Sequence, residues 1–307
     1  MSVLYNISDA SSINVFSTSL FILGSGSDDR ALTMIQYITK IENHIGTIVL
    51  IKYDDSLVES ILSASFPKTN IVILHSTSEQ SDFLLQLKKR SDILATNELF
   101  IDMTAIRIPE MFITFKFLHQ LNRQIKIHTI YSTPFDYEFP QEPFTSYRSY
   151  YGNLKTLDLI GYGGLSDDMS YSQLIMFLGF EGVLSAKVNE DIQYNKLTLV
   201  NNLPSFYEKY KDISVINNYE LLSSGQTHMF YVPANNPFET YNFLSKHIIE
   251  DEPACIAPLS TKPIALGVCL YALHHDTIRV VFPIAENYYS HMTNSVHNTY
   301  IYTIIIE

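Results

Sequence analysis

The chain has 307 residues, of which 46% are hydrophobic and 17% are charged. This composition supplies a large apolar core and excludes a mainly disordered chain, and the length suits two domains of about 150 residues each. The formal net charge is −12, so we expect no binding to duplex nucleic acid, which usually needs a basic face. The apolar runs at 15–23 and 300–306 are too short to cross a bilayer, and the N-terminus lacks the pattern of a signal peptide. The expected location is therefore cytoplasmic, with no membrane partner.

The first half of the sequence alternates strand and helix patterns. Short, β-branched apolar runs predict strands, and runs with apolar residues at helical spacing predict helices between them. The strands are expected at 15–23, 47–51, 70–74, 99–102 and 125–131, with a helix after each of the first four. These strand runs are apolar on both faces, as in a parallel sheet that is covered by helices on both sides. The pattern indicates βαβ units and a first domain over residues 1–137.

Residues 138–170 are rich in Tyr, Pro, Phe and Gly and show no clear period. We interpret this stretch as an aromatic-rich connector, or alternatively as a functional flap. The alternation resumes afterwards and predicts a second domain over residues 171–307. Strands are expected at 173–178, 197–201, 214–217, 254–257 and 278–282, and helices at 182–192, 205–211, 237–249 and 263–273. A β-prone tail at 299–306 is expected to add an edge strand.

Three segments of the first half resemble segments of the second half in the same order. Gly24, after the first strand, corresponds to Gly179, and the turn 102–107 lies opposite 257–262. In the third pair, the segment that leads to Tyr137 resembles the segment that leads to Tyr288. We predict an α/β fold of two Rossmann-like parallel-sheet halves that are related by internal duplication. The alternative is that two Rossmann-like segments share only this general pattern.

In such a fold a ligand lies beyond the carboxyl ends of the strands, where backbone N–H groups and helix dipoles favour an anion such as phosphate. The first candidate loop contains Gly24 and Ser25, which allow close approach of a ligand. It also contains Asp28, which is expected to hold a ribose hydroxyl or a base. The third glycine of a dinucleotide fingerprint is absent. The alternative is that Ser27 or Asp28 only caps the following helix.

The second candidate loop follows the fourth strand, which ends at Asp102. Thr104 offers a hydroxyl group there, and Arg107 offers a planar, permanently charged guanidinium group for a phosphate. The alternative is an internal ion pair between Asp102 and Arg107.

The second half repeats both loops. Gly179 follows its first strand in a less polar turn, and Ser260, Thr261 and Lys262 follow its fourth strand just as a helix begins. A lysine is notable here, because residues 154–307 contain 8 Lys and Arg against 16 Asp and Glu. We therefore regard this turn as the most promising ligand site. The alternative is an ordinary capped helix with a solvent-exposed Lys262.

A turn of Thr or Ser with a basic residue, between a Rossmann strand and its helix, resembles the CRISPR-associated Rossmann fold sensors. In those proteins such a turn helps to hold a cyclic or linear oligonucleotide messenger. The likeness covers the Rossmann cores and two loops, although several of those sensors have Gly-Gly where this chain has Ala105-Ile106 and Ser260-Thr261. Those sensors usually dimerise to build the pocket, whereas two fused halves would supply a pseudo-twofold cleft within one chain. The resemblance implies a nucleotide-sensing role in antiviral defence.

No sequence motif fixes a reaction. The chain lacks GxxxxGK[ST], GxSxG, HExxH and any Cys–His cluster, so neither a metal nor a cofactor is expected. The cysteines, Cys255 and Cys269, are expected to be buried reduced thiols. Three functions remain open: a sensor of a nucleotide-like small molecule, an enzyme that uses Asp28, Asp29 or Asp102 as acid or base on a nucleotide, and a scaffold for another protein. We favour the sensor. Whether it also binds a protein partner or forms a homodimer is left open.

Overall fold

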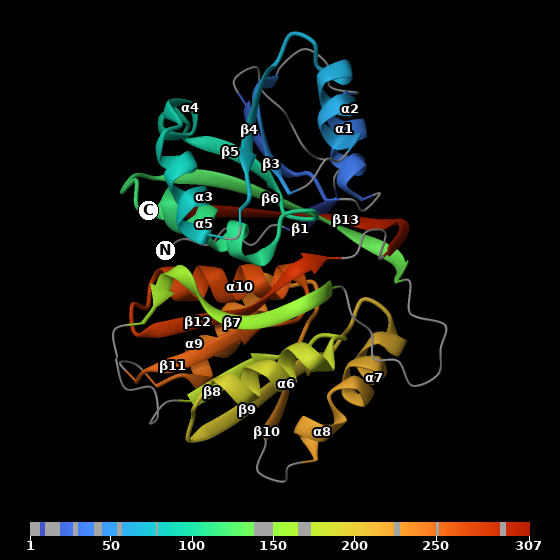
Figure 1. Cartoon of the computed structure of the whole chain (residues 1–307), viewed down its shortest axis with the longest axis vertical. Coiled ribbons are helices and arrows are strands. Elements are labelled where there is room, and N and C mark those ends of the chain that lie inside the picture. The colour runs from blue at the N-terminus through green and yellow to red at the C-terminus, as the bar shows by residue number, and fades with distance from the viewer. Residues whose placement is uncertain are drawn as a thin grey trace. The chain divides into compact units, whose positions relative to one another are not determined.

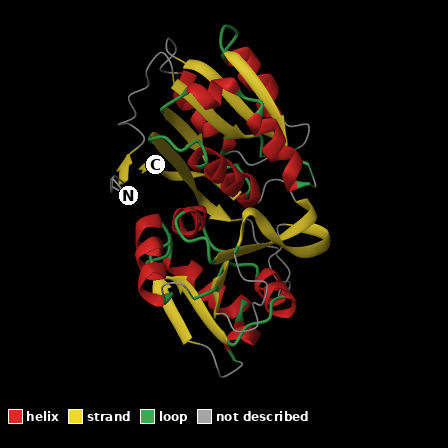
Figure 2. Ribbon diagram, turned by 90° about the vertical axis from the view of Figure 1, so that its left-hand side faces the viewer, coloured by secondary structure: helices red, strands yellow, loops and turns green. Residues whose placement is uncertain are grey.

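The computed structural model describes residues 7–9, 19–26, 30–39, 45–53, 57–77, 79–137, 150–164, 173–223, 228–249, 252–288 and 293–307. The chain divides into two compact units. Unit 1 comprises Met1–Glu138 and Ser290–Glu307, and unit 2 comprises Phe139–Tyr289. Each unit is an α/β structure with a sheet between helices (Figures 1 and 2).

Unit 1 contains one mainly parallel sheet. Its strands are β1 (Ile7–Asp9), β2 (Ser19–Gly24), β3 (Ile45–Lys52), β4 (Asn70–His75), β5 (Glu98–Asp102), β6 (Ile125–Tyr137) and β13 (Thr293–Ile306). Its helices are α1 (Ala31–Thr39), α2 (Leu57–Ser65), α3 (Gln80–Lys88), α4 (Ser91–Ala95) and α5 (Ile108–His119). Among the described residues the strand order is β1-β13-β6-β5-β2-β3-β4. The strands from β6 to β4 are parallel, and β13 is antiparallel to β6.

The central strands of unit 1 are apolar on both faces because both faces are covered. In β3, residues 48–51 are all fully buried. Helices α1 and α2 cover one face of the sheet, where Ile35 and Leu62 pack into the core, and α3, α4 and α5 lie on the other (Figure 1). Burial of branched apolar side chains on two faces is what stabilises a short parallel strand.

Unit 2 has the same construction. Its strands are β7 (Tyr150–Gly163), β8 (Gln173–Phe177), β9 (Lys196–Asn202), β10 (His228–Val232), β11 (Ala254–Pro258) and β12 (Ile278–Tyr288). Its helices are α6 (Gly182–Asp191), α7 (Glu208–Asn217), α8 (Tyr219–Leu222), α9 (Pro237–His247) and α10 (Lys262–Leu273). The strand order in the described residues is β10-β9-β8-β11-β12-β7, with β7 antiparallel and the others parallel. Helix α10 is buried from Pro263 to Leu273, which anchors the loop before it.

The five parallel strands of each unit are wound identically. Numbered along the chain within each unit, they lie in the order third, second, first, fourth, fifth. This confirms the predicted α/β fold of two Rossmann-like halves. In both units the chain reverses its direction of winding between the first and fourth strands, and this switch point is where ligands bind in such sheets.

The two units exchange their antiparallel strands. Strand β7 follows β6 along the chain but pairs with β12 in unit 2, and β13 follows β12 but pairs with β6 in unit 1. The first stretch of unit 1 ends at Glu138, within one residue of the expected boundary, but the division differs from the expected one after that point. The expected connector, 138–170, contains a strand of unit 2, and the expected edge strand of the second half lies in the sheet of unit 1, between β1 and β6. A sequence pattern indicates a strand but not its partner, which long-range packing decides.

One further element differs from its prediction. Residues 214–217 lie in α7 rather than in a strand, and the third parallel strand of unit 2 is β10. The short β-branched run is helical here because Ser214 is buried and donates a hydrogen bond from Oγ to the Gly179 carbonyl oxygen (3.1 Å). Residues 15–18 of the first expected strand lie outside the described residues.

Both cysteines are buried and free of disulfides, as expected. Burial raises the pKa of the Cys255 thiol to about 12, which keeps the thiol protonated and unreactive. None of the helices in the described parts of the chain has the length and apolar character that a membrane crossing requires.

Candidate functional site

The loops after the first and fourth parallel strands touch each other in both units. A Cβ atom on Gly24 would lie 2.4 Å from the carbonyl oxygen of Ala105, and one on Gly179 would lie 2.2 Å from that of Leu259. Neither distance is possible for a residue with a side chain, so glycine is required at both positions. Both glycines thus allow close approach of the neighbouring loop of the same unit.

The helices after the fourth strands begin in corresponding ways. Arg107 is the N-cap of α5 and Thr261 is the N-cap of α10, and a proline follows in the first turn of each helix. Arg107 therefore corresponds to Thr261 rather than to Lys262. The sequence alignment of 102–107 with 257–262 is therefore shifted by one position at each end, because β5 ends at Asp102, β11 ends at Pro258, and the loop of unit 1 is longer.

Three predicted site residues of unit 1 hold its loops together. The buried Ser25 hydroxyl accepts a hydrogen bond from the Tyr53 backbone N–H (3.0 Å). The buried Asp102 carboxylate accepts one from the Thr104 backbone N–H (3.0 Å), and the Thr104 hydroxyl accepts one from the Ser132 backbone N–H (2.9 Å). These groups stabilise the carboxyl edge of the sheet from within.

The predicted residue Arg107 is placed at the surface of this edge by an aromatic ring. Its guanidinium carbon lies 4.2 Å from the centre of the Tyr53 ring, and its backbone N–H donates to the Tyr53 hydroxyl (2.8 Å). Our sequence reasoning missed Tyr53, although its position directly after the second strand is a usable signal. Asp28, together with Ser27 and Asp29, lies outside the described residues.

A buried carboxylate in the first turn of α5 was also missed. Glu110 is 7% exposed, and its Oε1 atom accepts a hydrogen bond from the Ser76 hydroxyl (2.5 Å). Its Oε2 atom has no hydrogen-bond partner among the described residues. The helix dipole favours a negative charge at this position. The edge of unit 1 therefore combines a stacked guanidinium group with a buried acid.

In unit 2, the loop that contains the predicted residue Gly179 is fixed by α7 and α8. The Gly179 carbonyl oxygen accepts a hydrogen bond from Asn218 Nδ2 (2.9 Å), and the Phe180 carbonyl oxygen accepts one from Asn217 Nδ2 (2.6 Å). In a trans peptide the next N–H points opposite to the carbonyl group. The N–H groups of Phe180 and Glu181 therefore point away from α7 and α8. Glu181 is the N-cap residue of α6, makes no side-chain hydrogen bond to the cap, and adds a negative charge there.

Ser260, Thr261 and Lys262, at the start of α10, are partly exposed. The Thr261 hydroxyl donates to the carbonyl oxygen of Ala234 (2.6 Å) and makes no cap hydrogen bond to α10. Lys262 is the first residue of this 12-residue helix. The turn thus places a positive charge beside helix amides that the cap side chain does not cover.

Ser260 is held by a residue at the end of another strand. Asn202, the last residue of β9, donates a hydrogen bond from Nδ2 to Ser260 Oγ (2.8 Å). Because Ser260 Oγ accepts this bond, its own hydrogen is directed to a different acceptor. Asn202 is 6% exposed, and its Oδ1 atom has no hydrogen-bond partner among the described residues. Sequence reasoning missed Asn202, although the end of the second strand is a known ribose position in Rossmann sheets.

Aromatic rings lie at the same edge of unit 2. The rings of Phe180 and Tyr210 are 5.1 Å apart, and those of Tyr207 and Tyr210 are 5.3 Å apart. Phe180 and Tyr207 are partly exposed, whereas Tyr210 is buried beneath them. Such rings offer flat apolar surfaces to a base.

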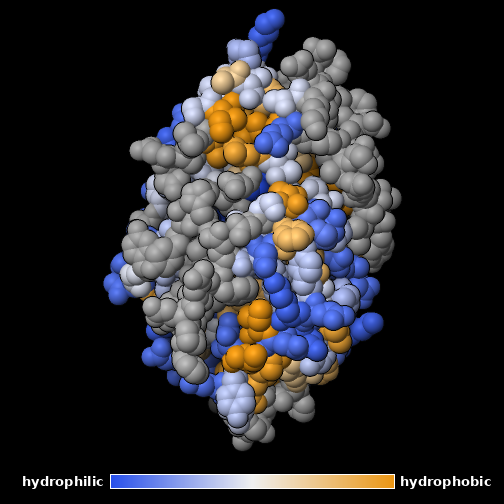
Figure 3. Space-filling model, turned by 90° about the vertical axis from the view of Figure 1, so that its right-hand side faces the viewer, coloured by the Kyte–Doolittle hydropathy of each residue, from blue (hydrophilic) through white to orange (hydrophobic). Residues whose placement is uncertain are grey.

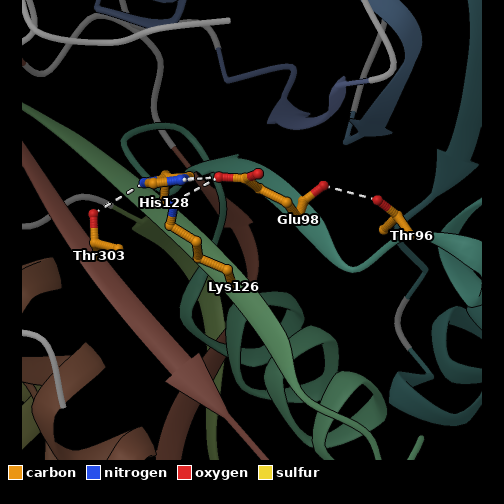
Figure 4. Close-up of polar contacts among 5 residues, drawn as sticks. All are labelled: Thr96, Glu98, Lys126, His128 and Thr303. Carbon is orange, nitrogen blue, oxygen red and sulfur yellow. Dashed lines mark hydrogen bonds and ion pairs between the residues drawn. The ribbon is translucent and has the colours of Figure 1, made fainter. Parts of the chain in front are cut away.

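A polar cluster occupies the opposite edge of the unit 1 sheet (Figure 4). His128 Nε2 lies 2.9 Å from Glu98 Oε1, His128 Nδ1 lies 2.9 Å from the Thr303 hydroxyl, and Lys126 Nζ lies 2.8 Å from Glu98 Oε1. Burial lowers the pKa of His128, and the hydrogen bond to Glu98 partly offsets this. Burial alone would raise the pKa of Glu98, but its hydrogen bonds with Lys126 and His128 bring it below the usual value.

This cluster adjoins a cavity of about 570 Å³, which Asn97, Arg123, Gln124, Lys126 and Ile305 line. The cavity lies at the amino ends of β5 and β6, whereas ligands of parallel sheets bind at the carboxyl ends. We therefore interpret the cluster as structural. In the described part of the chain, no group of three or more His, Cys, Asp and Glu residues is arranged to hold a metal ion.

Exposed hydrophobic residues do not single out a partner surface. Ile216 and Tyr219 are exposed at the junction of α7 and α8. On the face in Figure 3, hydrophobic residues form separate small groups among hydrophilic ones. Scattered exposure of this kind is normal for a protein surface.

Comparisons with known proteins leave the function open. No protein-family model matches the chain, and no curated protein matches it. Among solved structures, the cytoplasmic domain of a prokaryotic cation chloride cotransporter matches with a TM-score of 0.25 and 10% sequence identity. The match covers 87% of this chain and 95% of that chain. A likeness this weak carries no argument, so the site is judged from its own residues.

Proposed function

We propose that unit 2 binds a phosphorylated, nucleotide-like small molecule at the carboxyl edge of its sheet and acts as a sensor or regulatory module. The observation that supports this most is the Ser260 hydroxyl group. It accepts a hydrogen bond from Asn202, which leaves its hydrogen for an acceptor beyond the described residues of the turn. A phosphate oxygen is such an acceptor, and it would lie beside the start of α10 and the charge of Lys262.

The start of α10 suits a phosphate better than the start of α6. Both helices begin at the switch point, but the N-cap residue of α6 is the acidic Glu181, which repels an anion. Helix α10 begins with Lys262, which attracts one. The partly exposed rings of Phe180 and Tyr207 lie at the same edge and support stacking of a base.

The resemblance to CRISPR-associated Rossmann fold sensors favours an oligonucleotide messenger and antiviral defence as the biological setting of this proposal. Arg107, which stacks on the ring of Tyr53, stays a predicted phosphate-binding residue of unit 1.

A thermal-shift screen with mono- and dinucleotides, cyclic oligonucleotides and dinucleotide cofactors tests the proposal. A ligand at one hundred times its Kd stabilises the folded chain by about 2.7 kcal/mol, which raises Tm by roughly 4 °C in a protein of this size. Ser260→Ala and Lys262→Ala should reduce this shift. Ser245→Ala and Lys246→Ala are matched controls, because both residues are exposed at the far end of α9, and they should keep it.

Two results would contradict the proposal. One is a screen in which no nucleotide raises Tm. The other is a Tm shift that is as large in Ser260→Ala and Lys262→Ala as it is in the control variants. Recovery of the bound nucleotide separates binding from catalysis, since a sensor returns the ligand unchanged and an enzyme returns a product.

A further inference from the structure

We infer that β10 is a docking edge, which pairs in the antiparallel sense with β10 of a second copy of the chain. The strand is the outermost one in the sheet of unit 2, and β9 is its partner among the described strands (Figure 1). The inference goes beyond the proposed function, because it concerns the side of the sheet and not the carboxyl ends of its strands.

The outer side of β10 presents backbone groups that have no partner in the described part of the chain. The Val232 carbonyl oxygen accepts a hydrogen bond from the Leu203 backbone N–H (2.9 Å), so the backbone groups of Val232 face β9. Successive residues of a strand direct these groups to opposite sides, and those of Met229 and Tyr231 therefore face outward. Neither residue makes a backbone hydrogen bond there. Two N–H groups and two carbonyl groups are thus available to another strand.

These four groups match those of a second copy. In a twofold antiparallel arrangement centred on Phe230, Met229 lies opposite Tyr231 of the other copy, and each such pair exchanges two hydrogen bonds. The next outward residue is Pro233, which has no N–H to donate, so a longer or shifted incoming strand would meet a missing donor. The twofold arrangement uses each available group once and does not involve Pro233.

The side chains of β10 suit the same arrangement. The strand contains no Asp, Glu, Lys or Arg, so self-pairing brings no like charges together along it. Tyr231 is 47% exposed, and Met229 is partly exposed on the same face of the sheet. Pairing places the Met229 thioether beside the Tyr231 ring of the other copy, which is a favourable contact. Phe230 points to the other face and keeps its packing on Phe243 of α9, at 5.6 Å between ring centres.

The corresponding edge of unit 1 is closed by a side chain. The Ser76 backbone N–H donates to the Lys52 carbonyl oxygen of β3 (2.9 Å), so the backbone groups of the preceding residue, His75, face outward from β4. Gln86 of α3 binds both of them, because its Oε1 atom accepts from the His75 N–H and its Nε2 atom donates to the His75 carbonyl oxygen (2.8 Å each). Gln86 thus occupies the place of an incoming strand. Among the described residues, β10 has no such cap.

The antiparallel edge strands are less suited to pairing. Strand β1 has only three residues. Strand β7 carries the exposed charges of Lys155 and Asp158 and has left-handed backbone at Gly152 and Gly161 (φ 86° at both). Charges and local irregularities are the features by which edge strands avoid pairing. Of the four described edges, β10 is therefore the one that suits a partner strand.

Sedimentation equilibrium of the full chain from about 10 μM to 1 mM tests the inference. A contact over one five-residue strand is smaller than the interface of about 800 Å² per partner that stable complexes bury, so association should depend on concentration. The mean mass should rise from that of one chain toward that of two. Tyr231→Pro removes an outward N–H and should weaken association at least tenfold. Ile73→Pro is the matched control on the outer side of β4 and should associate as the unmodified chain does.

Disulfide cross-linking tests the register of the two strands. Residues that exchange hydrogen bonds in an antiparallel pair have Cα atoms about 5.5 Å apart, a distance that a disulfide spans. Under mild oxidation, a mixture of Met229→Cys and Tyr231→Cys chains should therefore form a cross-linked dimer. Tyr231→Cys alone should not, because its two copies would lie roughly 8–9 Å apart. The native cysteines are buried and do not compete.

Three results would overturn the inference. The first is a chain that stays monomeric at every concentration, and the second is association that is as strong in Tyr231→Pro as in Ile73→Pro. The third is cross-linking of Tyr231→Cys alone to the same extent as the mixture. If Tyr231→Pro does not fold, cross-linking of the mixture decides between pairing and its absence. The thermal-shift screen tests the nucleotide site separately.

Discussion

The carboxyl edges of the two units share one winding but use their polar residues differently. In unit 1 the side chains of Ser25, Asp102 and Thr104 are buried and bonded to backbone groups of the same edge. In unit 2, Ser260 is partly exposed and accepts a hydrogen bond from Asn202, whose Oδ1 atom has no partner among the described residues. Residue type alone thus does not mark a binding site. The partners of each group decide whether it holds the loop or meets a ligand.

Loop length accounts for part of this difference. Residues 103–107 join β5 to α5 in unit 1, whereas only 259–261 join β11 to α10 in unit 2. The longer loop has enough residues to turn inward and bury Thr104. The shorter loop passes directly into its helix, so that Ser260 and Thr261 stay at the surface.

The largest expected effect concerns the contact that both edges share. Gly179→Ala should lower the free energy of unfolding by about 2–3 kcal/mol, because the added Cβ meets the Leu259 carbonyl oxygen at 2.2 Å. Gly163→Ala is the matched control, since no heavy atom lies within 4 Å of its added Cβ. Urea unfolding measures both variants. Equal midpoints for the two would show that the loops of unit 2 are not in contact.

A smaller effect distinguishes the structural role of the carboxyl edge in unit 1 from the proposed binding role of the carboxyl edge in unit 2. Thr104→Val removes the acceptor of the buried Ser132 N–H, so it should cost about 1–2 kcal/mol of stability and leave nucleotide affinity unchanged. Ser260→Ala should weaken nucleotide binding at least tenfold. Unfolding and binding measured on the same two variants check this contrast. A tenfold loss of affinity in Thr104→Val would place the ligand in unit 1 instead.

The smallest expected effect is a pH dependence at the amino edge of unit 1. Burial holds the pKa of His128 below its usual value of 6.5, so the unfolded chain takes up a proton more readily than the folded chain. Stability that depends on neutral His128 is complete above pH 6.5 and is lost as the pH falls below that value. His128→Gln should remove this part of the acid sensitivity in urea unfolding from pH 7 to pH 5. Glu98 contributes at lower pH, since its pKa lies below 4.5. An unchanged pH profile in His128→Gln would show that the histidine titrates normally.

Local patterns predicted most of the parallel strands because each is a short apolar run that must be buried on two faces. Residues 47–51, for example, lie within β3 as expected. The exchange of β7 and β13 could not be predicted, because both are ordinary strand sequences whose partners lie more than a hundred residues away. The turn 260–262 was predicted as a ligand site from its hydroxyl and basic residues, and this stays a prediction. Asn202 was not, because its role depends on one contact with Ser260 across another strand.

Amide chemical-shift mapping with adenosine 3′-monophosphate tests the central claim most directly. The proposed site predicts that the largest shifts occur at Ser260 and in the first turn of α10, and that the amides of 103–107 move little. Largest shifts in 103–107, or at the amino edges of the sheets, would contradict it.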